Sequence, residues 1–292
     1  MRTALVLGGS GQVGRPLLAL LARAGWEVQA LSRQARPDAP GLRWLRGDLA
    51  RAPALPARFD AILSCGPLDR FARWYQDADI DCPRVVAFGS TSVEVKRDSA
   101  DAGERDVAAR LRAGEAGVLD AARVRGAAAT LLRPTLVYGA GGDRTLTRIA
   151  AIAGRWHRFA LPRDATGLRQ PVHVDDLARA AFDALDAAPT HGHAYALPGG
   201  ESLPYREMVA RVLDALSPPA RLHLLPPPAF AALLAGAHAA GIARDFNRAA
   251  LARMREDLVF DAAPARRDFG YAPRRFAPEA GMFDNGRVFD SG

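Results

Sequence analysis

The chain has 292 residues, 49% of them hydrophobic, enough for one large α/β domain or for a nucleotide domain with a smaller lobe. Its formal net charge is +7, yet Lys96 is its only lysine, so 38 of the 39 basic residues are arginines. Together with the abundant alanine, this bias is typical of GC-rich coding sequences, so the charge does not indicate nucleic-acid binding. A basic surface still favours anionic ligands.

Cysteine use and hydropathy predict a cytoplasmic protein without a membrane span. Only Cys65 and Cys82 are present, and no charged and apolar leader precedes the first strand, so reduced thiols are expected. The longest apolar segment, 226–243, contains three prolines and two glycines and is too short to span a bilayer. It predicts a lobe helix; a membrane-surface contact is the alternative. Zinc-ligand spacing and an ATP-type glycine-lysine-serine loop are both missing.

The first 25 residues predict a strand, a glycine turn and a helix. Residues 3–7 form an aliphatic run, 8–14 read Gly-Gly-Ser-Gly-Gln-Val-Gly, and 15–24 have helical apolar spacing. Such a turn brings backbone N–H groups and a helix N-terminus to a pyrophosphate. A glycine turn without a ligand is the alternative. The predicted cofactor contacts in this turn are Gly8, Ser10, Gly11, Gln12, Val13 and Gly14.

The second strand, 27–31, runs into Ser32 and Arg33 and bears on cofactor choice. Folds that prefer NAD place an acid roughly 20 residues after the last motif glycine, whereas an arginine there suits a 2′-phosphate. Arg33 holds that position, so the sequence favours NADP over NAD, with Ser32 and Arg33 as contacts. The alternative is that Arg33 is an ordinary surface residue.

Later strands supply further candidates at their carboxyl ends, where open α/β sheets bind ligands. Asp48, with Leu49, follows a strand at 42–46 and either reaches the adenine amino group or caps the next turn. Cys65 and Gly66 end the strand that begins at 61 and are expected beside the cofactor. The strand 84–88 ends in Gly-Ser-Thr-Ser, which makes the hydroxyls of Ser90 and Thr91 candidates for polarising a substrate oxygen.

The second half predicts the rest of the nucleotide domain and a smaller lobe. A helix at 102–125 precedes a sixth strand from 128, which should end at Pro134 because proline cannot donate to a ladder. Residues 170–178 read as a short strand entering a helix that Asp175 or Asp176 caps. We expect 1–140 and parts of 165–200 to form the nucleotide domain, and 141–164 and 201–292 to form the lobe.

In this order the motifs resemble those of the extended or atypical short-chain dehydrogenase/reductase family, which includes nucleotide-sugar epimerases and dehydratases. The segments that carry the resemblance are 8–14, 47–49, 90–92, 132–139 and 171–178. The resemblance implies an α/β fold, with a Rossmann-type doubly wound parallel sheet and a smaller C-terminal substrate lobe. It also implies a small-molecule substrate near the loop after the sixth strand, with Pro134 at the cofactor and Tyr138 and Arg144 at the substrate.

The sequence departs from this family at its catalytic Tyr-x-x-x-Lys pair. The tyrosine moves a proton at a substrate oxygen, and the lysine lowers a tyrosine pKa that is otherwise about 10. Aligning Glu115 with the glutamate that often follows the pair puts Val107 and Leu111 at the two positions, and Ser92 precedes the only lysine by four residues. Neither expected side chain is therefore present.

Two functions remain open. In the first, the chain is an NADP-dependent oxidoreductase or epimerase-like enzyme in which His173, with an ordinary pKa of about 6.5, replaces the missing acid/base. The alternative role for His173 is a buried, hydrogen-bonded imidazole that positions the lobe. In the second, the chain binds NADP(H) without turnover as a sensor, regulator or assembly protein. The sequence does not indicate an oligomeric state.

Overall fold

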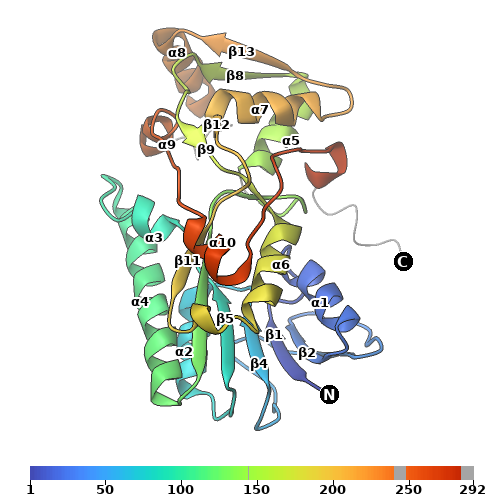
Figure 1. The fold of residues 1–292 in the computed structure, drawn as a ribbon. Coiled ribbons are helices and arrows are strands. Elements are labelled where there is room, and N and C mark those ends of the chain that lie inside the picture. Colours follow the sequence, from blue (N-terminus) through green and yellow to red (C-terminus); the bar gives the residue numbers. More distant parts are fainter. Residues whose placement is uncertain (144, 240–247, 284–292) are drawn as a thin grey trace. The chain divides into compact units, whose positions relative to one another are not determined.

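A computed structural model describes residues 1–143, 145–239 and 248–283 (Figure 1). The described chain divides into two compact units. Unit 1 comprises Met1–Thr135, Val172–Pro198 and Asp261–Pro273, and unit 2 comprises the remaining segments, Leu136–Pro171, Gly199–Phe260 and Arg274 onward. Among the described residues, no helix combines the length and apolar character that crossing a membrane requires.

Unit 1 is built on a seven-stranded sheet in which every neighbouring pair of strands is parallel. Its order is β11 (Ala194–Leu197), β6 (Ala128–Pro134), β5 (Arg84–Phe88), β4 (Ala61–Ser64), β1 (Thr3–Leu7), β2 (Glu27–Ser32) and β3 (Leu42–Arg46). The residues of β4 and β5 are all buried, as expected for central strands covered on both faces. The predicted doubly wound parallel sheet is confirmed.

Two helix pairs flank this sheet: α2 (Leu68–Asp77) packs on α4 (Ala102–Val124), and α1 (Gly14–Arg23) packs on α6 (Val174–Ala184) (Figure 1). A buried cluster that includes Leu5, Ile62, Phe71, Tyr75 and Val118 joins the first pair to the strands. The remaining elements of unit 1 are α3 (Ser92–Val95), β10 (Val172–His173), η1 (Ala188–Thr190) and α10 (Ala263–Phe269).

The segment Asp261–Pro273 lies in unit 1, whereas the sequence assigned all of 201–292 to the lobe. Two hydrogen bonds explain this difference. The Tyr195 hydroxyl donates to Asp268 at 2.7 Å, and the Tyr271 hydroxyl donates to the Pro198 carbonyl at 2.8 Å. Both partners lie far from the segment in sequence, so no local pattern shows these contacts.

Unit 2 has its own hydrophobic core, which includes Tyr138, Ile149, Phe159, Met208 and Phe276. A parallel pair joins β8 (Arg158–Pro162) to β13 (Arg221–Leu225), and an antiparallel pair joins β9 (Leu168–Arg169) to β12 (Leu203–Pro204). The other elements are β7 (Val137–Tyr138), α5 (Leu146–Trp156), α7 (Tyr205–Asp214), α8 (Pro227–Ala239), α9 (Arg248–Arg253) and η2 (Ala280–Phe283).

Candidate functional site

The glycine loop between β1 and α1 is packed so tightly that two of its glycines have no room for a side chain. Gly8 has φ +78°, and a Cβ there would lie 2.9 Å from the carbonyl carbon of Cys65. At Gly14 a Cβ would lie 2.2 Å from the oxygen of Gly8. A Cβ at Gly11 would approach only the Gly8 oxygen, at 3.1 Å. Gly8 and Gly14 therefore shape the loop, and Gly11 leaves open the space beside it.

The loop also presents the donors that a pyrophosphate requires. Within the described residues, the amide groups of Gln12 and Val13 have no hydrogen-bond acceptor, and the first turn of α1 contains no acid. The Oε1 atom of Gln12 is buried without a hydrogen-bond partner in this part of the chain. Amides at a helix N-terminus attract anions, so the loop residues fit the diphosphate of a dinucleotide.

A second group of polar side chains follows β2. The Ser32 hydroxyl accepts hydrogen bonds from the Gln34 amide at 3.2 Å and from Nε of Arg36 at 3.3 Å. The Arg36 guanidinium lies 5.3 Å from the centre of the Trp44 ring. Ser32 and Trp44 therefore orient Arg36, which the sequence did not single out because a loop residue has no periodicity.

Arg15 adds a second cation to this group. Its Nε donates to the carbonyl of Ser10 at 3.1 Å. Burial and then the nearby charge of Arg36 lower the pKa of Arg15, so the two guanidiniums interact electrostatically. Arg33, the arginine that the sequence favoured, is exposed and makes no side-chain hydrogen bond within the described residues.

Asp48 caps a turn in this structure. Its Oδ1 accepts from the amides of Ala50 and Arg51, both at 2.9 Å, which corresponds to one of the two roles that the sequence left open. Leu49 packs against the core beneath α2 and α4. The adenine role of Asp48 and the cofactor contact of Leu49 therefore stay predictions.

Cys65 directly follows β4 and precedes Gly66, beside the glycine loop. Its amide donates to the Leu7 carbonyl at 2.8 Å, which holds the two strand ends together. Burial raises the pKa of the Cys65 thiol to about 12, so the thiol stays neutral at physiological pH. Cys65 therefore places a neutral side chain next to the glycine loop.

The hydroxyls after β5 have different environments. Thr91 is buried, and its amide and hydroxyl both donate to the carbonyl of Pro134 at 3.2 Å, which ties the end of β5 to the end of β6. Ser90 is half-buried, and its Oγ accepts from the Ser92 amide at 3.1 Å. Within the described residues the Ser90 hydroxyl donates no hydrogen bond, whereas the Thr91 hydroxyl donates to the Pro134 carbonyl.

The face of α4 on which the catalytic pair is expected is apolar in its middle. Val107 and Leu111 are half-buried there. Closer to the start of the helix, Oε1 of buried Glu104 lies 3.7 Å from Nζ of Lys96, and its Oε2 accepts from the Ser99 hydroxyl at 2.7 Å. The only lysine thus lies near α4 but pairs with a carboxylate rather than a tyrosine.

Arg133 connects β6 to α4 and α3. Its Nε and Nη2 donate to the two carboxylate oxygens of buried Glu115 at 2.7 and 2.6 Å, and its Nη1 donates to Glu94 at 2.9 Å. A bidentate pair of this kind is strong and directional. Glu115 therefore has a structural partner on the neighbouring strand.

His173 is the N-cap of α6, a role that the sequence assigned to Asp175 or Asp176. The imidazole is buried, and its Nδ1 accepts from the Asp175 amide at 3.2 Å. Both aspartates instead lie in the first helical turn, where carboxylates favour the helix dipole. An imidazole in its neutral form that accepts at Nδ1 carries its proton on Nε2. The Nδ1 atom also lies 3.5 Å from Oδ2 of Asp175.

Tyr138 and Arg144 are the two substrate contacts that the sequence predicts. Tyr138 is completely buried in the core of unit 2, where its ring meets Phe276 edge-on at 4.8 Å between centroids. The structure therefore places Tyr138 in the core rather than on an accessible wall. Arg144 lies outside the described residues. Within the described ranges, no group of three or more His, Cys, Asp or Glu side chains could hold a metal ion.

The doubly wound sheet, with a glycine loop at the end of β1, defines a Rossmann-type protein. A model of the NAD dependent epimerase/dehydratase family matches residues 4–79 and 105–197. The 2-alkyl-3-oxoalkanoate reductase of Stenotrophomonas maltophilia (strain K279a) is 30% identical over 252 residues, which cover 74% of this chain and 76% of that protein. The chain belongs to the NAD dependent epimerase/dehydratase family.

Solved structures agree on the fold. Epimerase Mth375 from Methanothermobacter thermautotrophicus has a TM-score of 0.68 and 18% identity, and the match covers 94% of this chain and 88% of that one. MoeE5 in complex with UDP-glucuronic acid and NAD has a TM-score of 0.66 and 19% identity, with 94% of both chains covered. At these identities, the likeness establishes the architecture alone.

Proposed function

We propose that the chain binds NADP(H) through the glycine loop and the arginines beside it. The observation that carries this proposal is the orientation of Arg36 by Ser32 and Trp44, with Arg15 close enough for their charges to interact. Two adjacent cations favour a dianionic 2′-phosphate over a ribose hydroxyl. The nearby acid, Asp38, already accepts from the Trp44 amide at 2.7 Å.

We further propose that the protein is an oxidoreductase or epimerase-like enzyme. The cofactor would supply or accept hydride, and the chain would handle the accompanying proton. Ser90 has a hydroxyl proton that can polarise a carbonyl oxygen, and a neutral His173 would carry on Nε2 the proton to be transferred. Thr91 would hold the end of β5 in place through its hydrogen bond to the Pro134 carbonyl at the end of β6.

Two substrate classes are consistent with this proposal, and both contain anionic groups. The reductase relative is named for 2-alkyl-3-oxoalkanoates, which are carbonyl acids. The MoeE5 structures contain UDP-glucuronic acid or UDP-glucose, which are nucleotide sugars. We propose a small carbonyl or hydroxyl compound from one of these classes.

The second candidate function is NADP(H) binding without turnover, as a sensor, regulator or assembly protein. The half-buried Val107 and Leu111 on α4 favour it, because neither side chain can transfer a proton or lower a pKa. A substrate screen that follows NADPH absorbance distinguishes the two functions. Consumption of NADPH with a carbonyl compound supports the enzyme, whereas no consumption across oxo acids and nucleotide sugars supports the binding protein.

Cofactor choice is tested by fluorescence titration of NADPH and NADH. Arg36→Ala removes a charge-assisted contact, so we expect NADPH affinity to fall roughly 10- to 100-fold while NADH affinity changes little. Arg33→Ala is tested in parallel, and Arg73→Ala, an exposed arginine of α2, is the control. Equal losses for both cofactors in Arg36→Ala would contradict a 2′-phosphate role.

The proton role of His173 is tested with His173→Asn. Asparagine is a good N-cap residue and can still accept from the Asp175 amide, so α6 should begin as before. If His173 transfers the proton, we expect kcat to fall by roughly 10² to 10⁴ with unchanged NADPH affinity. Undiminished kcat would leave His173 only its capping role.

A further inference from the structure

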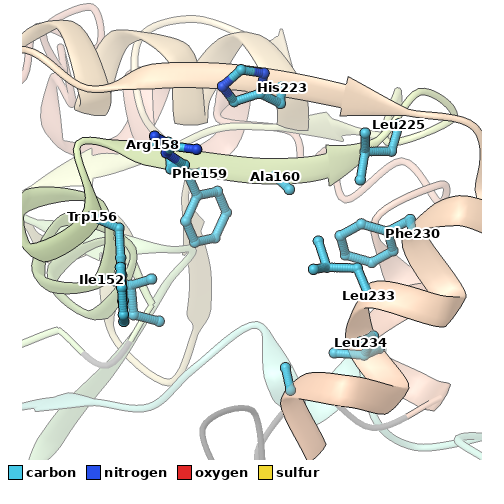
Figure 2. Close-up of a pocket in the computed structure, with 11 residues that line it drawn as sticks. Ile152, Trp156, Arg158, Phe159, Ala160, His223, Leu225, Phe230, Leu233 and Leu234 are labelled. Atoms are coloured by element: carbon cyan, nitrogen blue, oxygen red, sulfur yellow. The ribbon is translucent and has the colours of Figure 1, made fainter.

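A cavity of about 460 Å³ lies within unit 2, away from the glycine loop in sequence and built from residues of that unit alone. Figure 2 shows Ile152 and Trp156 of α5 on one side of it and Phe230, Leu233 and Leu234 of α8 on the other, beneath β8 and β13. This volume is in the range of small-molecule sites.

The lining is almost entirely apolar, and part of it is exposed to water. Phe159 and Phe230 are buried, whereas Trp156 is 54% exposed and Leu233 is 51% exposed. Leaving a large apolar side chain half in water gives up much of its burial free energy, and contiguous exposed apolar surface commonly marks a binding site. The exposed Trp156 and Leu233 are therefore the surfaces that a ligand would cover.

Among the described elements that build the cavity, every charged side chain is basic. The four elements that build it, α5, β8, β13 and α8, contain no aspartate or glutamate. Arg158 and His223 line the cavity, and Arg221 lies opposite Arg158 in the β8–β13 ladder. Neither arginine forms an ion pair within the described residues. Cations that have no carboxylate partner in the described part of the chain, beside an apolar cavity, favour a ligand with an anionic head.

We propose that this cavity binds a long-chain acid, with its alkyl chain between α5 and α8 and its carboxylate at Arg158 and His223. A sugar fits poorly, because its hydroxyls would lose hydrogen bonds to water without replacement by the apolar lining. A flexible alkyl chain has no such groups to desolvate. The cavity thus recognises an amphipathic anion, and this assignment does not depend on whether the glycine loop holds NADP(H).

Displacement of the fluorescent fatty acid cis-parinaric acid from the full chain tests the proposal. We expect saturable binding and competition by octanoate, decanoate and dodecanoate, each added pair of methylenes tightening binding roughly tenfold. Dodecanoate should compete better than dodecanol or dodecylamine, because only the acid carries a negative charge. Absence of saturable binding, or equal competition by all three head groups, would overturn the proposal.

Two variant pairs locate the site. Leu233→Asp places a charge in the cavity and should weaken dodecanoate binding at least tenfold, whereas Leu224→Asp, at an exposed leucine that does not line it, should not. Arg158→Gln should remove the preference for dodecanoate over dodecanol, with exposed Arg206→Gln as the control. Unchanged thermal melting checks the fold of each variant. Equal effects within either pair would contradict the assignment.

A last measurement distinguishes a free acid from a lipid surface. Sedimentation with phosphatidylglycerol vesicles should leave the protein in the supernatant, because the proposed site takes one alkyl chain from solution and does not require a membrane surface. Co-sedimentation that Leu233→Asp abolishes, without dodecanoate binding in solution, would assign the same residues to a membrane contact and overturn the proposal. NADPH titration of these variants separates failure of this site from failure of the glycine loop.

Discussion

Two arginines of the described residues, Arg84 and Arg169, are buried hydrogen-bond donors. Arg84 of β5 is 6% exposed and has no carboxylate hydrogen-bond partner among the described residues. It donates to the carbonyls of Ala184 and Leu185 at 2.6 and 3.1 Å and to the hydroxyls of Thr130 and Thr190 at 2.7 and 2.8 Å. Burial lowers the pKa of Arg84 to about 10, so it remains charged at neutral pH.

Arg84→Met should therefore destabilise unit 1 strongly. The substitution keeps an apolar stem but removes the donor to four carbonyls, those of Val85, Ala128, Ala184 and Leu185, and to the hydroxyls of Thr130 and Thr190, at an expected cost of about 3–5 kcal/mol. The urea midpoint of the circular-dichroism transition measures this loss. Arg73→Met, at an exposed arginine of α2, should change the midpoint little; similar midpoints for the two variants would show that the Arg84 network contributes little.

The glycine loop permits a matched pair of alanine substitutions. Gly14→Ala places a Cβ 2.2 Å from the Gly8 oxygen and 2.6 Å from the Gly9 Cα, so the backbone must move. We expect about 1–3 kcal/mol of destabilisation. Gly11→Ala meets only the Gly8 oxygen at 3.1 Å, so it should keep the melting temperature but weaken NADPH binding. Normal NADPH affinity in Gly11→Ala would make the glycine turn purely structural.

At the scale of elements, ion pairs of Glu201 connect α7 of unit 2 to Arg275, in the segment after α10. The side chain of Glu201 is 10% exposed; it pairs with Arg211 of α7 and with Arg275, the latter at 2.9 Å from Nε to Oε2. Burial alone would raise the pKa of Glu201, but hydrogen bonds from Arg275 and Arg211 outweigh it and hold the pKa below its ordinary value.

The stabilisation from Glu201 should therefore be lost in acid. A carboxylate whose folded pKa is depressed stabilises the fold above its unfolded pKa of about 4.3, and the contribution disappears as pH falls through the lower folded value. We expect Glu201→Gln to melt below wild type at pH 7 and to converge with it as pH falls below about 4. Differential scanning calorimetry measures both; an equal gap at pH 7 and pH 3.5 would contradict the assignment.

At the scale of the whole molecule, the two units carry separate candidate ligand sites. The glycine loop with Arg15 and Arg36 belongs to unit 1, and the apolar cavity belongs to unit 2. A ligand that binds only the native state stabilises it in proportion to the logarithm of its concentration over Kd.

Hydrogen exchange should therefore distinguish the two ligands. NADPH should slow exchange most strongly at residues 8–16 and 32–36, and dodecanoate should do so at 146–162 and 221–237. Mass spectrometry of peptic fragments gives the comparison directly. Protection of the cavity segments by NADPH alone, or of the glycine loop by dodecanoate alone, would contradict the two assignments.

The sequence by itself determined the features whose physics is local. An aliphatic run that ends in closely spaced glycines predicts β1, the loop and α1, because backbone freedom and apolar periodicity reside in neighbouring residues. Pro134 predicts the end of β6 for the same reason, since a missing N–H acts at its own position. The order of the motifs along the chain was sufficient to predict the family to which the chain belongs.

Only the tertiary structure decided which side chains meet. Arg84 and Thr190 are separated by 106 residues, and Tyr271 and Pro198 by 73, so no spacing rule connects them. The cap at His173 and the burial of Tyr138 depend likewise on packing. The cavity of unit 2 exists because four elements from two distant stretches enclose it, whereas in sequence its residues read as ordinary apolar positions.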